Sequence, residues 1–363
     1  MRQLYKTLAI AVLMISVPAI AQQTAVESVW KVTQHSSEAS FRGVHVVGDG
    51  SNVWASGSKG TILNSRDHGT TWNDVSPTGA EAFDFRDIHG FDGQHAVAMA
   101  VGSPARIYRT DNAGRQWTLV YEDDRPEIFL DAMAFWDAEN GIAFGDPIDG
   151  KVIVLLTEDG GRSWQELAKE KQPPSLSGEG GFAASGTCLC LQEQNVFIGL
   201  GGAHQAADPP TARILKSADR GQTWQALDST LASAAASGVF SIVFVDEQNG
   251  VAVGGTYDQP ADTSSHISIT NDGGQTWTRP DSIPTGYRSC VFKVPNPDGD
   301  HPVRLIAIGK TGADYSNDMG RSWKPIDNTG FYAADSCNLG KTVIAVGSDG
   351  RIGQLPVLEL ELD

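Results

Sequence analysis

One eight-residue pattern occurs six times along this 363-residue chain and constrains the fold more than any other feature. Each copy, here called an octet, begins with Ser or Thr, has Asp or Asn third and Gly fifth, and ends with Trp. The octets are SRDHGTTW at 65–72, TDNAGRQW at 110–117, TEDGGRSW at 157–164, SADRGQTW at 217–224, TNDGGQTW at 270–277 and SNDMGRSW at 316–323. Their starts lie 45, 47, 60, 53 and 46 residues apart. Such a period is typical of a four-stranded propeller blade.

A second pattern precedes each octet: an apolar alternating strand that ends in Gly, then a loop, then a strand that runs into the octet. There is one more of these strand endings than there are octets. They close at Gly57, Gly102, Gly145, Gly202, Gly255, Gly309 and Gly347. The sequence therefore predicts seven blades, the last of which lacks an octet.

The N-terminus accounts for the missing octet. Every octet leads into an outer strand that begins with its Trp, and VWKVT at 29–33 supplies one further Trp without an octet before it. We predict that 29–33 is the outer strand of the seventh blade, whose inner strands lie within 331–357, because this closure leaves fewer exposed strand edges. The seven equivalent tryptophans are then Trp30, Trp72, Trp117, Trp164, Trp224, Trp277 and Trp323. The predicted fold is all-β: a single seven-bladed β-propeller of four-stranded antiparallel blades over 22–363.

The first 21 residues have the pattern of a secretory signal peptide. Arg2 and Lys6 precede an apolar run over 8–17, and the small residues of 19–21 fit cleavage after Ala21. The run is too short to span a bilayer, and no later stretch is apolar enough for a membrane helix. We therefore expect a periplasmic or secreted protein without an integral membrane segment after signal removal.

Charge and motifs narrow the classes of function. A formal net charge of −17 argues against nucleic acid as a partner, since binding phosphates requires clustered Lys and Arg. The chain contains no C-x-x-C, H-E-x-x-H or G-x-S-x-G motif and no Gly-rich phosphate loop before a helix. We therefore expect no cofactor and no metal site.

Four cysteines leave two interpretations open. An even count in an exported chain permits disulfides. Cys188 and Cys190 point the same way in a predicted strand, which is poor geometry for a bond, whereas Cys290 and Cys337 occupy similar places in consecutive repeats and are the better pair. The alternative is four thiols that act as small buried hydrophobic groups.

The octet has a mechanical interpretation as a tight turn between the third and fourth strands. Its Asp or Asn accepts hydrogen bonds from turn amides, its Gly tolerates positive φ, and its Ser or Thr bonds locally. Each Trp then contributes about 2 to 3 kcal/mol of apolar burial between sheets. The third positions are Asp67, Asn112, Asp159, Asp219, Asp272 and Asp318. We expect these residues to be structural.

The octet resembles the Asp-box, or BNR repeat, of sialidases, sortilin-type receptors, xyloglucanases and photosystem II assembly and stability factors. Six copies carry the resemblance across nearly the whole chain after residue 21. Blades of about 45 residues, the lead-in GSKGTILNS at 57–65 and one seven-bladed ring are most similar to the photosystem II assembly-factor-like group. The resemblance implies a propeller whose Asp-boxes lie opposite its functional face, but a fold does not fix a function.

The functional face is expected at the entries to the innermost strands and in the loops after the Gly endings. The charged residues at these entries are Arg42, Arg86, Asp87, Asp131, Arg288 and Asp335. They predict a polar site around one mouth of the channel. The alternative is a set of charges that solvate the channel and pair with one another.

Longer loops in blades 3, 4 and 5 fall on the same face, at 145–151, 201–213 and 254–266. They carry Asp146, His204, Tyr257 and His266, and loops with such residues often bind ligands, although they can equally be decoration. The Pro-, Gly- and Ser-rich stretch 169–186 also belongs to this face, as a lid or a linker.

Two functions follow from these residues. The preferred one is a non-enzymatic binding or assembly module that recognises a polypeptide segment or a small ligand, because Arg is a bidentate donor to carboxylates. The photosystem II factors imply a chaperone-like role of this kind. The expected ligand-binding residues are Arg42, Arg86, Arg288, His204, Tyr257 and His266.

The alternative is a glycoside hydrolase of BNR-repeat type with a carbohydrate substrate. It requires two carboxylates that flank the sugar bond. The candidates are Asp87, Asp131, Asp146 and Asp335. The Arg-Ile-Pro segment that sialidases share is absent from the sequence, and seven blades depart from the six of sialidases.

Overall fold

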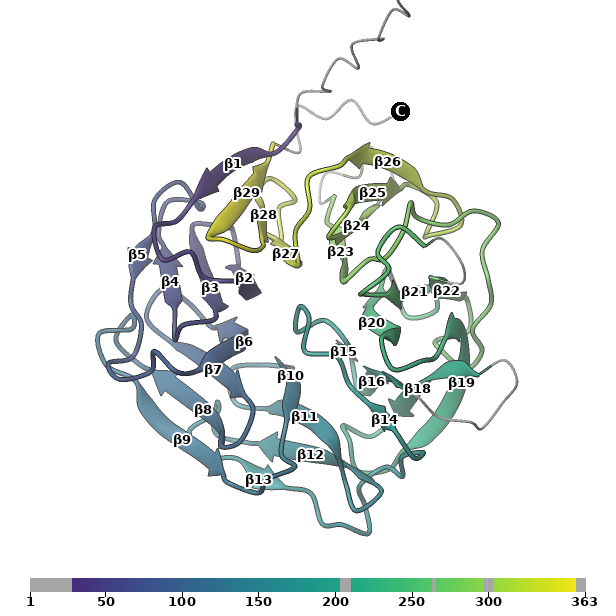
Figure 1. Cartoon of the computed structure of the whole chain (residues 1–363), viewed down its shortest axis with the longest axis horizontal. Coiled ribbons are helices and arrows are strands. Elements are labelled where there is room, and N and C mark those ends of the chain that lie inside the picture. The colour runs from purple at the N-terminus through teal and green to yellow at the C-terminus, as the bar shows by residue number, and fades with distance from the viewer. Residues whose placement is uncertain (1–27, 203–209, 263–265, 297–298, 300–302, 357–363) are drawn as a thin grey trace, which may run out of the picture.

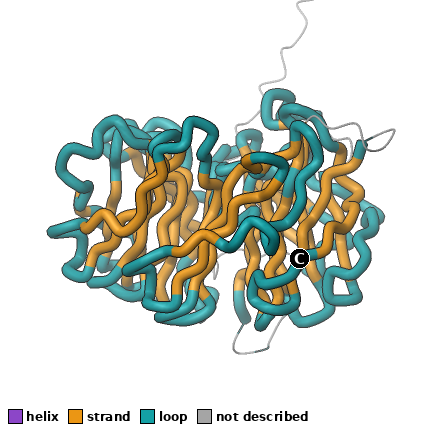
Figure 2. Tube along the Cα trace, turned by 90° about the horizontal axis from the view of Figure 1, so that it is seen from below, coloured by secondary structure: helices purple, strands orange, loops and turns teal. Residues whose placement is uncertain are grey.

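In the computed structural model, small antiparallel sheets are arranged in a ring around a common centre, which we call the channel (Figure 1). The structure describes residues 28–202, 210–262, 266–296, 299 and 303–356. Within these ranges the chain forms strands, turns and loops and no helix, so none of the described residues belongs to a helix that could cross a membrane. Seen from the side, the strands run between two faces that carry the loops (Figure 2). The predicted seven-bladed β-propeller is confirmed.

Each blade takes its strands from the innermost outward. Blade 1 contains β2 (Phe41–Val47), β3 (Asn52–Gly57), β4 (Ile62–Ser65) and β5 (Asn73–Asp74), and blade 2 contains β6 (Asp84–Gly90), β7 (Ala96–Val101), β8 (Ala105–Thr110) and β9 (Thr118–Asp123). Blade 3 contains β10 (Leu130–Phe135), β11 (Gly141–Ile148), β12 (Lys151–Thr157) and β13 (Gln165–Glu166), and blade 4 contains β15 (Leu189–Gln192), β16 (Asn195–Gly199), β18 (Thr211–Ser217) and β19 (Gln225–Ala232).

Blades 5 to 7 complete the ring. Blade 5 contains β20 (Ser237–Phe244), β21 (Gly250–Thr256) and β22 (Ile267–Thr270), and blade 6 contains β23 (Cys290–Val294), β24 (Arg304–Gly309), β25 (Gly312–Ser316) and β26 (Lys324–Asp327). Blade 7 contains β27 (Ala333–Ser336), β28 (Val343–Val346), β29 (Arg351–Leu355) and, from the other end of the chain, β1 (Lys31–Gln34).

The N-terminal strand closes the last blade, as the sequence predicts. Strand β1 pairs antiparallel with β29 over four positions, from Lys31↔Gln354 to Gln34↔Arg351. Just before it, Trp30 is 3% exposed, and its ring lies 4.9 Å from that of Phe331. The two ends of the chain therefore share one sheet.

Blade 5 departs from the regular pattern at both edges. Its outer strand is reduced to one bridge between Ile269 and Thr278, because Pro280 follows closely and has no N–H to extend the ladder. At the inner edge its sheet gains two short strands, β14 (Glu179–Gly180) and β17 (Gly201–Gly202), in the order β14-β17-β20. Since β17 directly follows β16 of blade 4 in the chain and pairs with β20, these strands link the sheet of blade 5 to blade 4.

Apolar clusters between neighbouring blades form the core. Between blades 7 and 1, partly buried Trp72 packs against a cluster that includes Val53 and Ile344. Between blades 3 and 4, Trp224 packs in the same way near Leu156. Of the seven tryptophans, four are less than 9% exposed and three are partly buried. The buried ones are Trp30, Trp164, Trp277 and Trp323. The repeated Trp thus joins each sheet to its neighbour.

The octet at 270–277 shows how the turn is held. The Asp272 carboxylate accepts hydrogen bonds from the Thr276 N–H and hydroxyl, at 2.9 and 2.6 Å, and the Thr270 hydroxyl donates to it at 2.8 Å. Burial acts to raise the pKa of Asp272, but these bonds together outweigh it and lower the pKa to about 2. Gly274 has a φ of 75°. The preceding position is also left-handed, even where it is not Gly, as at Met319.

The octets lie on the same face as the turns after the innermost strands. In five blades, the N–H at the fourth octet position donates to a carbonyl of that turn. The pairs are His68 to Ser51, Ala113 to Gln94, Gly160 to Glu139, Arg220 to Gln194 and Gly273 to Gln248, at 2.7 to 3.3 Å. The strand entries and the loops after the second strands therefore occupy the opposite face, which we call the mouth face.

The disulfide that the sequence permits between Cys290 and Cys337 is not formed, since all four cysteines are free thiols. Cys290 packs in the cluster between blades 6 and 7, whereas Cys337 packs in the cluster between blades 7 and 1. Equivalent positions in consecutive blades are separated by the spacing between two blades, and this spacing is longer than the Cα separation that a disulfide requires. Cys188 is buried as well, and Cys190 is partly buried, so the alternative interpretation as hydrophobic thiols describes these residues better.

Candidate binding site at the channel mouth

The stretch predicted as a lid or linker enters the channel. After β14, residues 181–187, which we call the plug, cross the mouth face before β15, and Figure 1 shows the loop that leads to β15 near the centre of the ring. The Phe182 ring stacks on Phe240 of blade 5, with centroids 4.0 Å apart. The Ser185 hydroxyl donates to the Ser289 carbonyl of blade 6 at 2.8 Å.

Glycines allow the plug to approach the opposite blades. A Cβ on Gly181 would lie 2.4 Å from an oxygen of Asp131 in blade 3, and a Cβ on Gly186 would lie 2.5 Å from an oxygen of Asp87 in blade 2. Gly186 also has a φ of 75°. A side chain at either position would push the plug away from the wall of the channel, so the glycines set its position.

A cavity of about 360 Å³ lies over the plug, and we call it the mouth pocket. Its floor is plug residues 181–184. Its walls come from blades 1, 2, 3, 5 and 6. The wall residues are Arg42, Arg86, Phe129, Phe240, Tyr257, Tyr287 and Lys310. The pocket thus combines three cations with aromatic rings.

Arg42 and Arg86 are neighbours in this pocket, as the sequence predicts. The Arg42 guanidinium lies 4.3 Å from the centre of the Tyr332 ring and donates no hydrogen bond to a described residue. Burial and the nearby charge of Arg86 lower the pKa of Arg42. Arg86 donates to Asp84 at 2.8 Å and to the Ala183 carbonyl at 3.3 Å. The positive charges of Arg42 and Arg86 are therefore close together, and the guanidinium N–H groups of Arg42 have no acceptor among the described residues.

Tyr257 and Lys310 form the outer rim of the mouth pocket. Tyr257 is 40% exposed, and its ring lies edge-on to both Phe182 and Phe240 at 6.3 Å. The Lys310 ammonium donates to the Tyr257 carbonyl at 3.0 Å and lies 5.5 Å from the centre of its ring. Tyr257 is therefore placed as the sequence predicts, on the mouth face beside the cations.

Arg288 does not line the mouth pocket, although the sequence predicts it as a ligand-binding residue. It is fully buried, and its guanidinium forms an ion pair with the buried Asp314 at 2.5 Å. The remaining donors go to the Tyr287 carbonyl and to the hydroxyls of Thr285 and Thr311. All its polar atoms are occupied within blade 6, so a ligand in the mouth pocket does not reach them.

Of the two candidate histidines, only His266 belongs to the described residues, and it does not line the mouth pocket. His266 is 1% exposed, and its Nε2 contacts the Asp262 carbonyl. Burial lowers its pKa. Its other nitrogen lies against Gly255, where an added Cβ would approach it to 2.6 Å. His204 lies outside the described residues.

Asp87 and Asp335 link neighbouring innermost strands. The oxygens of Asp87 accept hydrogen bonds from the Ile88 N–H at 2.8 Å and from the Met133 N–H of blade 3 at 2.7 Å. Asp335 likewise accepts hydrogen bonds from the Ser336 N–H and from the Val46 N–H of blade 1, both at 2.8 Å. Burial raises the pKa of both carboxyls, that of Asp87 to about 7.

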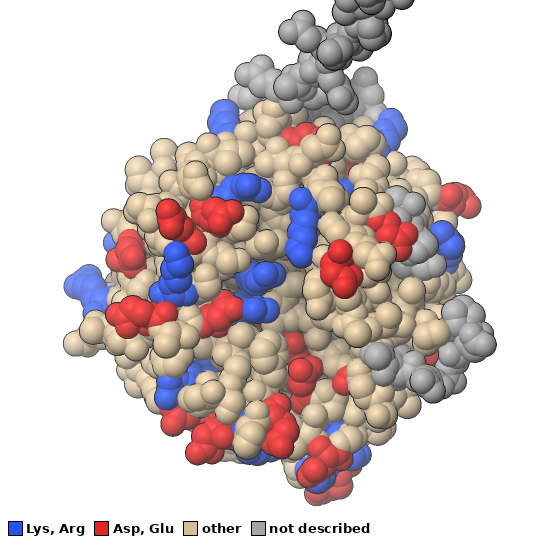
Figure 3. Space-filling model, viewed as in Figure 1, with Lys and Arg blue, Asp and Glu red and all other residues tan. Residues whose placement is uncertain are grey.

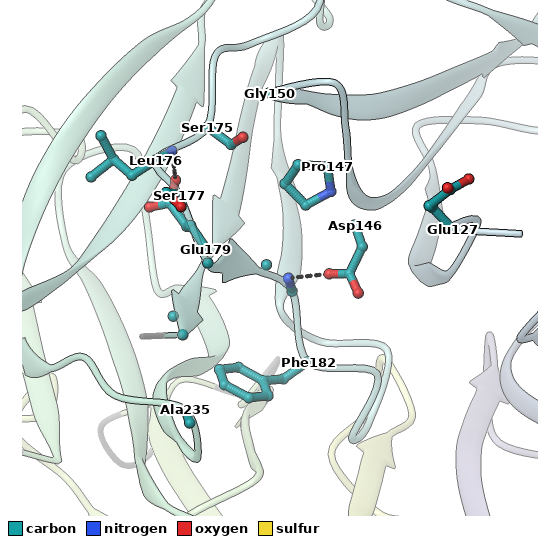
Figure 4. Close-up of a pocket in the computed structure, with 15 residues that line it drawn as sticks. Glu127, Asp146, Pro147, Gly150, Ser175, Leu176, Ser177, Glu179, Phe182 and Ala235 are labelled. Carbon is teal, nitrogen blue, oxygen red and sulfur yellow. Dashed lines mark hydrogen bonds between the residues drawn. The ribbon is translucent and has the colours of Figure 1, made fainter. Parts of the chain in front are cut away.

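Asp131 and Asp146 lie together beneath the plug. Asp131 is fully buried, and neither of its oxygens has a hydrogen bond of standard geometry with a described residue. Burial and the Asp146 carboxylate raise its pKa well above the ordinary range, against smaller lowering effects of Arg86 and the Ala183 N–H. Asp146 accepts a hydrogen bond from the Gly181 N–H at 3.0 Å (Figure 4), and burial raises its pKa too.

Sequence reasoning missed Phe182 and Lys310, whereas it placed Phe240 at the rim of the channel without assigning it a contact. Phe240 marks a strand entry, yet nothing local says that Phe182, which comes 58 residues earlier, stacks on it. A useful signal was the run of glycines at 178, 180 and 181 around the single Phe of this stretch, because glycines are needed where backbone approaches other groups closely. No metal-binding cluster of His, Cys, Asp or Glu occurs in the described ranges.

Comparisons with known proteins identify the architecture. No family model matches the chain, and no curated protein matches it. A solved structure of YCF48 bound to D1 peptide is 14% identical, with a TM-score of 0.63 over 91% of this chain and 98% of that chain. YCF48 from Cyanidioschyzon merolae is 15% identical, with a TM-score of 0.60 over 90% and 98%, and U3-55K is 11% identical, with 0.62 over 90% and 98%. Such low identities show a shared propeller fold and nothing finer.

Proposed function

We propose that this chain is an exported, non-enzymatic binding or assembly-factor-like propeller. Its ligand is a polypeptide segment, and the mouth pocket takes a carboxylate of that segment. Arg42 and Arg86 bind the carboxylate, while Tyr257 and Phe182 contact the adjoining apolar part. The proposal combines a charged group with aromatic surface, the usual composition of a selective binding site.

The observation that carries this proposal is the pair Arg42 and Arg86. Two partly buried guanidinium groups repel each other, and the burial of Arg42 adds to the cost. Arg42 has no hydrogen-bond acceptor among the described residues. A bound carboxylate relieves the repulsion and accepts bidentate hydrogen bonds from a guanidinium. The aromatic walls favour a ligand larger than a simple anion.

The similarity to YCF48 supports a polypeptide as the ligand. That propeller has been solved bound to D1 peptide. We further propose that the octets are Asp-boxes of the BNR type and that this chain belongs with the photosystem II assembly-factor-like group. Its processed form is residues 22–363 in the periplasm or outside the cell. The proposed signal sequence lies outside the described residues.

The glycoside hydrolase alternative has less support. It requires two carboxylates that face one open cleft. Asp87 and Asp335 use both oxygens to join the innermost strands, and Asp131 is fully buried beneath Gly181. Of the four candidates, only Asp146 lines one of the two large pockets of the mouth face. The four candidates therefore supply one accessible carboxylate, whereas this chemistry needs an acid and a base or nucleophile.

The test is peptide binding by fluorescence anisotropy, with labelled peptides of varied sequence that end in a free carboxylate or in an amide. We expect carboxylate peptides to bind, and the change of Arg42→Met with Arg86→Met to weaken them by about 2 kcal/mol or more. Arg115→Met is the matched control, because Arg115 is exposed in an octet on the opposite face. The proposal would be refuted if amide peptides bound as tightly as carboxylate peptides, or if the Arg42 and Arg86 variant bound carboxylate peptides as tightly as the native protein. Thermal stabilisation by oligosaccharides instead of peptides would favour the hydrolase.

A further inference from the structure

A second and larger cavity adjoins the mouth pocket on the same face. Its volume is about 710 Å³, and we call it the acidic pocket (Figure 4). It shares Gly181 and Phe182 with the mouth pocket, so the two cavities meet at the start of the plug. Glu127 and Asp146 line it from blade 3. No Lys or Arg is among the described residues that line it.

The charge of the acidic pocket is not neutralised by its surroundings. The lining residue Glu179 is paired with Arg213, so it adds no free charge. Glu127 is exposed and makes no hydrogen bond or ion pair with a described residue. The Asp146 carboxylate holds a single N–H, that of Gly181. This leaves two carboxylates on the wall that can accept from a ligand.

Asp131 points independently to a cation at this place. It is buried directly under Gly181, it interacts with Asp146, and its own oxygens lack a standard hydrogen bond. A buried, unsatisfied carboxyl group is unusual in a folded protein and calls for a compensating group. Arg86 supplies part of that compensation, and a positive group near Asp146 would add to it through the electrostatic field.

The mouth face therefore carries opposite charges on the two sides of Phe182. Arg42, Arg86 and Lys310 lie in the mouth pocket, and Glu127 and Asp146 lie in the acidic pocket. Figure 3 shows Lys and Arg side chains near the centre of this ring with Asp and Glu side chains beside them. A uniformly acidic or uniformly basic ligand would be attracted by one pocket and repelled by the other.

We propose that the acidic pocket takes a basic side chain of the same polypeptide whose carboxylate lies at Arg42 and Arg86. This inference rests on the proposed function and adds the chemistry of the partner: an extended segment with Lys or Arg a few residues before a carboxylate. Exposed backbone at Gly178 and partly exposed backbone at Gly180 and Gly181 give the segment hydrogen-bonding groups between the two subsites. Opposite charges also fix the direction in which the segment lies.

The experiment is a lysine scan. Fluorescein-labelled peptides of neutral sequence, each with a free terminal carboxylate, carry one Lys at successive positions before the end, and a matched set carries Met. We expect one register in which Lys improves binding about tenfold over Met at low salt, as a partly buried charge pair would. Asp146→Asn with Glu127→Gln should remove this advantage and leave binding of the Met peptide unchanged.

The controls separate the two proposals. Glu127→Gln alone changes an exposed side chain and should reduce the advantage of Lys without affecting folding, which protects the test if the Asp146 variant is unstable. If the Met peptides bind and no Lys register is preferred, or if the double acidic variant keeps the preference, this inference is overturned and the proposed function survives. If no carboxylate peptide binds the native protein, both are overturned.

Discussion

We expect the Asp87→Asn substitution to change the free energy of unfolding by an amount that depends on pH. Asp87 is 7% exposed at the contact between blades 2 and 3, and burial raises its pKa to about 7, although two N–H donors act in the opposite direction. The ordinary value is 3.8. Between these two pH values the folded protein binds a proton that the unfolded chain does not, so stability falls as pH rises through this window.

The magnitude follows from the two pKa values. The whole window corresponds to about 4 kcal/mol, and the part between pH 5 and pH 8 corresponds to about 2.5 kcal/mol. Asp87→Asn has no titrating proton at this position. The free energy of unfolding of this variant, measured relative to the native protein, should therefore rise by about 2.5 kcal/mol from pH 5 to pH 8.

The difference between the two proteins is the informative quantity, because other groups titrate as well. Burial raises the pKa of Asp131 and Asp335 in the same direction, whereas it lowers the pKa of His89 and His266, whose charging weakens the fold as pH falls below about 6.5. These contributions are common to both proteins and cancel in the comparison.

The assay is equilibrium urea unfolding, followed by Trp fluorescence at pH 5, 6, 7 and 8 and constant ionic strength. Asp49→Asn is the control, because Asp49 is exposed and its hydrogen bonds to Ser51 lower its pKa, so it stays ionised over this range. If the free energy of unfolding of the Asp87→Asn variant, relative to the native protein, stays constant or falls as pH rises, Asp87 is ionised in the folded state and the reasoning is refuted.

Three further predictions concern the ring and the plug. Trp30→Ala should cost about 3 to 5 kcal/mol by urea unfolding, since it removes a ring that is 3% exposed, whereas Val32→Ala, at a side chain 45% exposed in the same closing strand, should cost under about 0.5 kcal/mol. Gly181→Ala should weaken peptide binding in the anisotropy assay and expose the plug to limited proteolysis, because its Cβ would lie 2.4 Å from Asp131; unchanged binding and protection would argue against a fixed plug. Arg288→Met should destabilise the protein by about 3 to 5 kcal/mol in thermal or urea unfolding, because it leaves the buried Asp314 without its partner, and the double change Arg288→Met with Asp314→Leu should recover much of the loss.

The ring was predictable because its signals are local and repeated. Each octet specifies its own turn through side chains within eight residues, as Asp272 does with Thr270 and Thr276. Repetition then converts six weak local signals into one period. Trp30 needed only the additional rule that a propeller closes its last blade. These inferences depend on turn chemistry and counting and not on which side chains meet across the ring.

The site was less predictable because it depends on contacts between distant segments. Arg42 and Arg288 stand at equivalent strand entries, yet Arg288 is paired with the buried Asp314 in the third strand of its own blade, whereas Arg42 lies over Tyr332 in the channel. Sequence spacing alone does not distinguish the two. The plug is a further example, since the position of Phe182 depends on its stacking against Phe240 of blade 5.

The contacts of the innermost strands explain why so few of the predicted carboxylates remain for a ligand. A side chain on one innermost strand accepts a hydrogen bond from a backbone N–H on the next innermost strand. Asp87 is this acceptor between blades 2 and 3. The Ser241 hydroxyl is the acceptor between blades 5 and 6, where the Val291 N–H donates to it at 2.9 Å. Because a serine fills the same role, the charge of Asp87 is not what the position requires. Asp146 lies outside this set of contacts, at the register shift between Gly145 and Pro147 in its strand pair. The break in regular pairing, and not the presence of a carboxylate, therefore marks where the ring offers charge to a partner.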